Sequence, residues 1–190
     1  QLNKKDKVAI FMHKTPDADT IGSALGLAWY FQVKNNSECD IFYGGELSHP
    51  ENKAMVNLLD LKFKKIEGFK EDGYDYSVCV DCTESNVGVD NLKVDSIIDH
   101  HNIEVDADEY DLLINEDVGS CCTLVYELIS DTLDDINESD QQVPTAMLFG
   151  IIKDTRHLLS DNSTERDFAA YRALSKLGNK KKISDIQSYP

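Results

Sequence analysis

Apolar residues along the chain follow two alternating patterns, short continuous runs and longer segments with helical spacing. Four short runs are typical of buried strands: KVAIFMH (7–13), CDIFYG (39–44), YSVCVD (76–81) and VDSIID (94–99). Two further runs are weaker strand candidates: FKKIEG (63–68) and DLLINE (111–116). Helical spacing is found in the segments 20–33, 50–61, 120–133, 144–155 and 164–177. Strands that alternate with helices predict an α/β fold, with a mainly parallel sheet of about five strands and helices on both faces.

The chain length and the end of the periodic pattern predict the domain organisation. A chain of 190 residues suffices for one α/β domain, and it contains no internal repeat or low-complexity segment. The pattern weakens after Gly178, in GNKKKISDIQSYP. We therefore expect a single domain over residues 1–178 and a C-terminal tail, or the start of a linker, over 179–190.

The charge balance restricts the class of partner. The chain carries 19 Lys and Arg against 35 Asp and Glu, a formal net charge of −16. Proteins that bind long nucleic acid cluster basic residues, but the single dense basic run here is Lys180–Lys182, which a solvated face explains. An acidic protein that acts on phosphate must recruit positive charge, and metal ions are the obvious source.

Two further features bear on the location of the protein. The sequence has no run of ~20 apolar residues, so we expect no membrane span. No apolar signal segment precedes the opening charges QLNKKDK, so we expect a cytoplasmic protein.

The cysteines predict neither a disulfide framework nor a zinc site. Five are present, an odd number without regular spacing. Cys79 and Cys82 form a C-x-x-C sequence, but residues three apart in a strand point to opposite faces. We interpret these thiols as buried and structural.

Acidic residues and histidines gather where the predicted strands end. His13 closes the first predicted strand. The other acidic residues and histidines of this set follow the first strand, end or follow a later strand, or lie at the end of a helix: Asp17, Asp19, Asp81, Asp99, His100, His101 and Asp154. The carboxyl ends of parallel strands share one edge of the sheet, so these side chains can converge. Each alone is more often a cap, turn or surface residue. As a set, imidazole nitrogens and carboxylate oxygens suit Mn²⁺, Mg²⁺ or Fe²⁺, and two ions ~3.5–4 Å apart could share one aspartate.

Four motifs in this set resemble those of the DHH phosphoesterase superfamily. HKTPDADTIGS (13–23) resembles its first motif, VCVDCT (78–83) its isolated aspartate, DHHN (99–102) its namesake and GIIKDT (150–155) its fourth motif. They occur in the family's order and spacing, between about Lys7 and Thr155.

The resemblance implies two metal positions, most simply occupied by Mn²⁺. The ligands of one ion would be His13, Asp17 and Asp81. The ligands of the other would be Asp19, Asp81, His100 and Asp154. Asp81 would thus bridge the two ions.

The resemblance also implies roles around the ions. Asp99 would orient the His100 ring, and His101 would face the substrate and contact a phosphate oxygen. Gly22, near the end of the first motif, would let its helix pack closely against the sheet.

Substrate-binding candidates come from weaker likenesses. VGSCCT (118–123) resembles the family's small-residue segment, so Ser120 and Thr123 could hold a phosphate at a helix N-terminus; N-capping by Ser120 is the alternative. SHPENKAMVNLL (48–59) resembles a segment of nanoRNase-like members, in which His49 and Asn52 would line the cleft; an ordinary helix start is the alternative. Arg156 could bind a phosphate or be a surface charge.

Many members carry a second domain with a glycine-rich GGGH motif, which this chain lacks, since Gly44 and Gly45 are followed by Glu46. Either the chain is the catalytic half of a larger protein, or it is a short member; a homodimer stays open.

We expect hydrolysis of a phosphoester bond in a small nucleotide by a water activated by two metal ions. The substrate would be a short oligonucleotide, a nucleoside bisphosphate or a cyclic dinucleotide. The alternatives are a RecJ-type single-strand exonuclease, an inorganic pyrophosphatase and, outside enzymes, a nucleotide-sensing domain.

Overall fold

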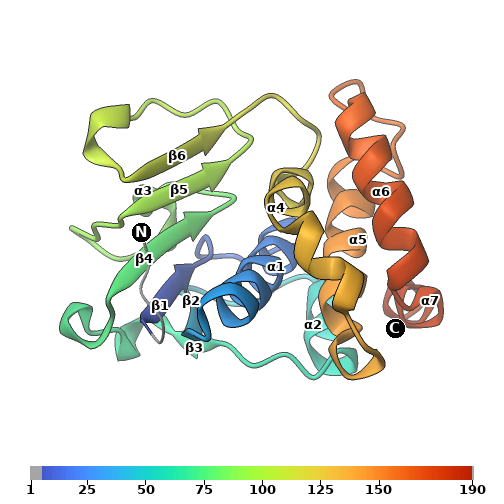
Figure 1. Cartoon of the computed structure of the whole chain (residues 1–190), viewed down its shortest axis with the longest axis horizontal. Coiled ribbons are helices and arrows are strands. Elements are labelled where there is room, and N and C mark those ends of the chain that lie inside the picture. The colour runs from blue at the N-terminus through green and yellow to red at the C-terminus, as the bar shows by residue number, and fades with distance from the viewer. Residues whose placement is uncertain (1–5, 190) are drawn as a thin grey trace.

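The protein contains a six-stranded parallel sheet, seen in a computed structural model that describes residues 6–189 (Figure 1). The strands are β1 (Lys7–Phe11), β2 (Glu38–Tyr43), β3 (Lys64–Lys65), β4 (Tyr76–Val80), β5 (Ser96–Asp99) and β6 (Leu112–Asn115). Their order in the sheet is β3-β2-β1-β4-β5-β6, and every pairing is parallel. The predicted α/β class and parallel sheet are confirmed, and the very short strand β3 forms one edge.

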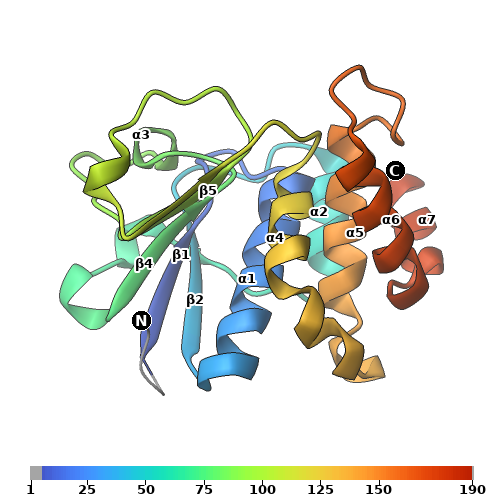
Figure 2. The ribbon, with the colours of Figure 1, turned by 45° about the horizontal axis from the view of Figure 1, so that its top comes forward.

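The long helices lie on one side of the sheet, in successive layers (Figures 1 and 2). They are α1 (Ala18–Asn35), α2 (Pro50–Leu58), α4 (Cys121–Ile129), α5 (Gln142–Asp154), α6 (Glu165–Leu177) and α7 (Lys180–Gln187). Helices α1 and α4 lie nearest the sheet, and α6 and α7 lie farthest from it. Among residues 6–189, no helix is both long enough and apolar enough to cross a membrane.

Short elements cover the other side of the sheet. They are the one-turn helix α3 (Glu84–Val87) and 3₁₀ turns at Ile66–Gly68, Glu71–Gly73 and Ala107–Glu109. Further 3₁₀ turns at Ser130–Asp135 and Glu138–Asp140 join α4 to α5. Helical elements therefore lie on both faces, as expected, but only one face carries long helices, since the connections after β4 and β5 contain just a one-turn helix and a 3₁₀ turn.

The core has two parts because strands of a parallel sheet are buried on both faces. Along β1, Val8 and Ile10 pack toward the long helices, while Ala9 and Phe11 point to the opposite face. Phe11 there packs edge-to-face with Phe69, with the ring centroids 4.9 Å apart. Aromatic side chains thus complete the core on the face that lacks long helices.

The C-terminal segment contains a packed helix. Asn179 caps α7, since its side-chain oxygen accepts a hydrogen bond from the Lys182 N–H at 3.0 Å. Ile183 and Ile186 are buried in the core on the helical side of the sheet. The run of three lysines lies in the first turn of α7. The domain boundary at residue 178 stays a prediction.

Two glycines let α1, α4 and α5 come together around one thiol. A Cβ atom on Gly22 would lie 2.7 Å from the Sγ of Cys122 and 2.8 Å from the carbonyl oxygen of Ala146. A Cβ atom on Gly150 would also lie 2.7 Å from the Sγ of Cys122, and 3.0 Å from the Cα of Asp19. The expectation that Gly22 faces the sheet is wrong: its missing side chain leaves room for α4 and α5.

We predict that Gly22→Ala destabilises the protein by about 1–3 kcal/mol, because the added methyl group overpacks the contact of three helices. The gain in helix propensity, about 1 kcal/mol, offsets part of this cost. The free energy of unfolding from urea denaturation measures the effect. Gly68→Ala is the matched control, because a Cβ atom there meets nothing within 4 Å. Equal stability of the two variants would contradict the close contact.

Candidate metal centre

The sheet brings the predicted site residues to one edge. Strands β1, β4 and β5 are neighbours, and their carboxyl ends point the same way (Figure 2). His13 follows β1, Asp81 follows β4, and His100 and His101 follow β5. Residues that are up to 88 positions apart in sequence therefore meet in space.

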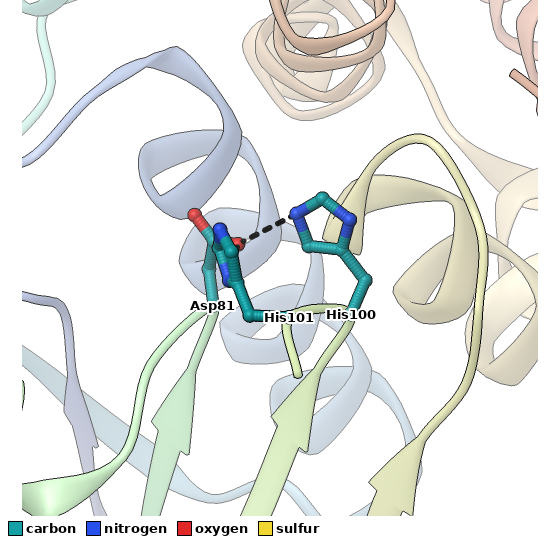
Figure 3. A group of neighbouring side chains, drawn as sticks. All are labelled: Asp81, His100 and His101. Carbon is teal, nitrogen blue, oxygen red and sulfur yellow. Dashed lines mark ion pairs between the residues drawn. The ribbon is translucent and has the colours of Figure 1, made fainter. Parts of the chain in front are cut away.

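The carboxylate of Asp81 lies beside the rings of His100 and His101 (Figure 3) and belongs to two groups of neighbouring ligand-type side chains. One of its oxygens, Oδ1, is 3.3 Å from the Nε2 of His100 and 3.7 Å from the Nδ1 of His101. The other, Oδ2, is 3.9 Å from the Nε2 of His13. Asp81 has a left-handed backbone with φ of 60°, a conformation that costs of order 1–3 kcal/mol outside glycine. The turn that begins at Asp81 directs its buried carboxylate toward the three histidines.

A first group of possible ligands consists of His13, Asp17 and Asp81, whose donor atoms lie within 4.8 Å of one another. Asp17 caps α1: its Oδ1 accepts hydrogen bonds from the N–H groups of Asp19 at 3.0 Å and Thr20 at 3.1 Å. Burial favours the neutral acid, but the His13 ring and these N–H groups outweigh it and lower the pKa of Asp17. Asp17 is thus held as an anion that faces His13.

A second group consists of Asp19, His100 and Asp154, again within 4.8 Å of one another. The Nε2 of His100 is 3.6 Å from Asp19 Oδ2 and 3.3 Å from Asp154 Oδ2. Asp154 is the last residue of α5, which Gly150 allows to approach α1. Helix contact therefore brings the two carboxylates to the same imidazole.

The N-terminus of α4 holds Asp19 in place. Asp19 accepts hydrogen bonds from the Ser120 hydroxyl at 2.5 Å and from the N–H groups of Cys121 at 2.7 Å and Cys122 at 2.9 Å. Burial, with a further contribution from the nearby Asp154, raises its pKa to about 6. These donors stabilise the charged form that metal binding requires.

The ring of His100 is oriented by a backbone carbonyl. Its Nδ1 is 2.9 Å from the carbonyl oxygen of Val118, so Nδ1 carries the proton and Nε2 faces the carboxylates. The atoms Asp81 Oδ1 and His100 Nε2 are both buried and have no hydrogen-bond partner among the described residues. Two buried ligand-type atoms that lie 3.3 Å apart, face each other as an ion pair and form no hydrogen bond fit a site for a cation.

Asp99 contacts a different histidine from the one that the resemblance implied. Its Oδ1 is 2.8 Å from the Nδ1 of His101 and accepts hydrogen bonds from the backbone N–H groups of His100 and His101. The expectation that Asp99 orients the His100 ring is wrong, because Val118 occupies that Nδ1. The hydrogen bond from Asp99 instead raises the pKa of His101, whose side chain is 58% exposed.

Two of the predicted substrate-binding residues are buried away from solvent. Ser120 donates its hydroxyl hydrogen bond to Asp19, and Thr123 donates its own to Asp167 Oδ1 at 2.6 Å. Neither the phosphate-binding role nor N-capping by the Ser120 hydroxyl agrees with these contacts. Both hydroxyls support carboxylates. Asp167 was not selected from the sequence. Its Oδ2 also accepts a hydrogen bond from the Gly119 N–H at 2.8 Å, which fixes the start of α4.

The remaining candidates separate into two cases. His49 caps α2. The side chain of Asn52 donates a hydrogen bond to the carbonyl oxygen of Pro16 at 3.1 Å. Both residues line a cavity of ≈ 340 Å³ beside Asp17 and Asp154. Arg156 is exposed, has a left-handed φ of 49° and lines neither this cavity nor the next one. His49 and Asn52 thus lie at the site, and Arg156 does not.

A larger cavity of ≈ 570 Å³ also adjoins the cluster and shares Thr15 and Asp17 with the smaller one. Its lining includes predicted residues: His13, Asp17, Asp81, Asp99 and His101. The lining also includes residues that sequence reasoning did not select: Lys14, Ser85, Asn86, Asn102 and Ile103. Helix α3, which supplies two of them, is too short to have a periodic signal.

Comparison with known proteins agrees with this geometry. The model of the DHH family, N-terminal domain, matches residues 7–151. The chain belongs to the DHH family. The resemblance inferred from the four motifs is therefore confirmed.

Several relatives of this DHH chain carry functional names. It is 29% identical to a probable manganese-dependent inorganic pyrophosphatase of Staphylococcus saprophyticus, over 96% of the chain and 58% of the relative. It is 32% identical to an uncharacterised protein of Methanocaldococcus jannaschii, over 88% of the chain and 34% of the relative. The chain thus spans between one third and three fifths of the length of these relatives.

Solved structures share the DHH fold. The crystal structure of a putative family II inorganic pyrophosphatase of Methanococcus jannaschii superposes with a TM-score of 0.73 at 27% identity, over 96% of this chain and 58% of that one. An exopolyphosphatase-related protein of Bacteroides fragilis superposes with a TM-score of 0.75 at 21% identity, over 97% of this chain and 57% of that one.

We predict that Mn²⁺ binding to this DHH domain releases a proton. Burial opposes protonation of His100, but Asp154 and Asp81 outweigh it and raise the pKa of His100 to about 12. The imidazole is therefore protonated at neutral pH, and Nε2 must lose its proton before it can bind an ion. Affinity should rise by about tenfold per pH unit between pH 6 and 8 if one proton is released.

Calorimetric titration with Mn²⁺ in buffers of different ionisation enthalpy measures the released protons. His100→Gln should reduce this release and weaken binding, whereas His157→Gln, at an exposed position outside the site, should change neither. A Mn²⁺ affinity of the native protein that does not change with pH would contradict the prediction.

Proposed function

We propose that this chain is the catalytic domain of a divalent-metal-dependent hydrolase that cleaves phosphoester or phosphoanhydride bonds of small substrates. The observation that carries the proposal is a pair of buried ligand-type atoms without a hydrogen bond, Asp81 Oδ1 and His100 Nε2, within a cluster of carboxylates. Membership of the DHH family and the manganese dependence in the names of the relatives support it.

In this proposal two Mn²⁺ ions occupy the site. His13, Asp17 and Asp81 would hold one, and the other would be held by Asp19, Asp81, His100 and Asp154. When bound, such ions would lower the pKa of a water molecule and neutralise charge on phosphate oxygens. Mg²⁺ and Fe²⁺ remain alternatives, because the same ligand types bind them.

His101 is our candidate for contact with the substrate. Its Nδ1 forms a hydrogen bond with Asp99 Oδ1 at 2.8 Å, so Nε2 is the ring nitrogen that can contact a ligand in the larger cavity. Because Asp99 raises the pKa of His101, the ring is more often protonated near neutral pH and can donate a hydrogen bond to a phosphate oxygen. It could equally donate a proton to the leaving oxygen. Asp99 acts here through His101.

Two substrate classes remain in the proposal. Small nucleotides are favoured by the cavity beside the cluster, which is roomy at ≈ 570 Å³ and contains neutral polar groups and Ile103, a lining that suits a sugar or base. Inorganic pyrophosphate is favoured by the names of relatives that are 27–31% identical. RecJ-type action on long single strands has no support from the charge, which is net −16.

A substrate panel tests the proposal. The purified protein, with and without Mn²⁺, is given short RNA, a nucleoside bisphosphate, a cyclic dinucleotide, pyrophosphate and a simple aryl phosphodiester. We expect Mn²⁺-dependent release of product from at least one of them. Binding of nucleotide without hydrolysis of any compound would favour the nucleotide-sensing alternative. Homodimer formation and a cytoplasmic location stay predictions, to be tested by light scattering and cell fractionation.

We predict that Asp81→Ala lowers turnover by about a thousandfold or more, because it removes a ligand from both ions and metal catalysis is worth several kcal/mol. His49→Ala, at the rim of the smaller cavity, should cost no more than about tenfold, the effect of one ordinary hydrogen bond. Arg156→Ala should cost less still, because Arg156 lies outside both cavities.

Steady-state kinetics on the best substrate of the panel, with Mn²⁺ content measured in parallel, compares these variants. Asp185→Asn is the matched control for the loss of one negative charge, since it is exposed on α7, outside both cavities. Near-normal turnover of Asp81→Ala would exclude a bridging role for this carboxylate.

A further inference from the structure

The larger cavity beside the cluster contains one basic side chain of the Lys or Arg type, Lys14. Lys14 directly follows His13, is exposed, and forms no ion pair with any residue in the described range 6–189. By contrast, Lys34 pairs with Asp131 at 2.6 Å. Lys14 thus presents an unneutralised positive charge beside a cluster that would bind phosphate.

The backbone around Lys14 packs closely against two glycines, Gly45 and Gly88. The Lys14 N–H donates a hydrogen bond to the carbonyl oxygen of Asn86 at 2.8 Å. A Cβ atom on Gly45 would collide with the carbonyl oxygen of Lys14, and one on Gly88 would lie 3.1 Å from the Lys14 Cβ. Gly88 also has a φ of 94°, which other residues rarely adopt.

The same packing joins three separate loops. A Cβ atom on Gly44 would collide with the carbonyl oxygen of Val87, so the loop after β2 lies against the end of α3 as well as against Lys14. Figure 2 places α3 above the carboxyl ends of the strands, where the cluster lies. The Gly44–Gly45 pair therefore allows the close backbone packing that fixes the position of the Lys14 Cα and Cβ atoms relative to His13 and to the cavity.

The other basic residues near the site are less suited to bind an anion. Lys153 lines the smaller cavity, but its Nζ is 2.6 Å from Glu51 Oε2 and its charge is compensated. Lys65 donates to the carbonyl oxygen of Gly45 and lies 4.3 Å from the centre of the Tyr43 ring. Lys14 is the one cation of the larger cavity that is not already engaged within the described part of the chain.

We infer that Lys14 binds a second, uncleaved phosphate group of the substrate, an inference that rests on the proposed function. The cleaved phosphate must lie at the carboxylate–histidine cluster, whereas Lys14, which is not a candidate metal ligand, lines the adjoining cavity together with the neutral Asn86 and Asn102. Ammonium groups bind phosphate as strong, charge-assisted donors. The preferred substrates are therefore compounds with two phosphate groups, such as pyrophosphate or a nucleoside bisphosphate, over simple diesters.

The test compares Lys14→Met with the native protein on two substrates in the presence of Mn²⁺. For pyrophosphate or the best two-phosphate compound, KM should rise by about tenfold or more, the effect of losing a hydrogen bond to a charged group, with little change in kcat. For bis(p-nitrophenyl) phosphate, which has one phosphate, kcat/KM should not change. Lys14→Arg, which keeps the charge, should restore most of the lost affinity.

Two controls separate a local effect from others. Lys176→Met removes an equal charge from an exposed position on α6 and should leave both substrates unaffected. Gly45→Ala should displace Lys14 together with His13 and therefore weaken Mn²⁺ binding as well, which Lys14→Met should not do. Equal KM values of Lys14→Met and native protein for the two-phosphate substrate would overturn the inference, even while hydrolysis proceeds.

A binding experiment keeps the inference testable if the proposed function fails. Methylenediphosphonate, which cannot be hydrolysed, is titrated into the Mn²⁺-loaded native protein and into Lys14→Met. Absence of hydrolysis by the native protein counts against the proposed function alone. Binding weakened by about tenfold or more in the variant supports Lys14 as a phosphate-binding residue; equal binding, or no binding to the native protein, overturns it.

Discussion

The contact of α1, α4 and α5 around the thiol of Cys122 is the constraint on which the site depends. Gly22 and Gly150 leave room for that thiol, and the helices approach until their backbones nearly touch. The approach places Asp19, on the first turn of α1, beside the end of α5 that carries Asp154. A close-packed interior transmits small displacements, so a bulkier residue at either glycine would separate the two carboxylates.

This packing creates an electrostatic cost that the fold must offset. Asp19, Asp81 and Asp154 all lie within 3.6 Å of the Nε2 of His100, and Asp19 and Asp81 are buried. Buried like charges repel strongly because the interior screens them poorly. Part of the repulsion is relieved by the donors at the start of α4 and by a protonated His100. A bound divalent cation would relieve more of it, so stability and metal affinity are linked in this domain.

The two cavities beside the site differ in the charged residues that line them. Toward the helices, carboxylates dominate and the smaller cavity contains a lysine that Glu51 compensates. Toward α3, the larger cavity is also lined by carboxylates, but it adds His101 and Lys14 as exposed basic groups and the neutral amides of Asn86 and Asn102. An acidic protein can thus attract phosphate locally despite its net charge, because fields near a cleft reflect the nearest groups more than the total.

Much of this could be predicted from the sequence, because strand and helix periods are local properties and the ends of parallel strands share one edge. The α/β class, the parallel sheet and the convergence of His13, Asp81 and His100 follow from that rule. Hydrogen-bond partners of single side chains depend on a few ångströms of helix placement, and sequence patterns do not carry that information. Only the tertiary structure could therefore decide that Asp99 contacts His101, that Ser120 supports Asp19 and that Gly22 faces two helices. It alone brought Lys14 to the cavity, since the glycines that hold it come from two other loops.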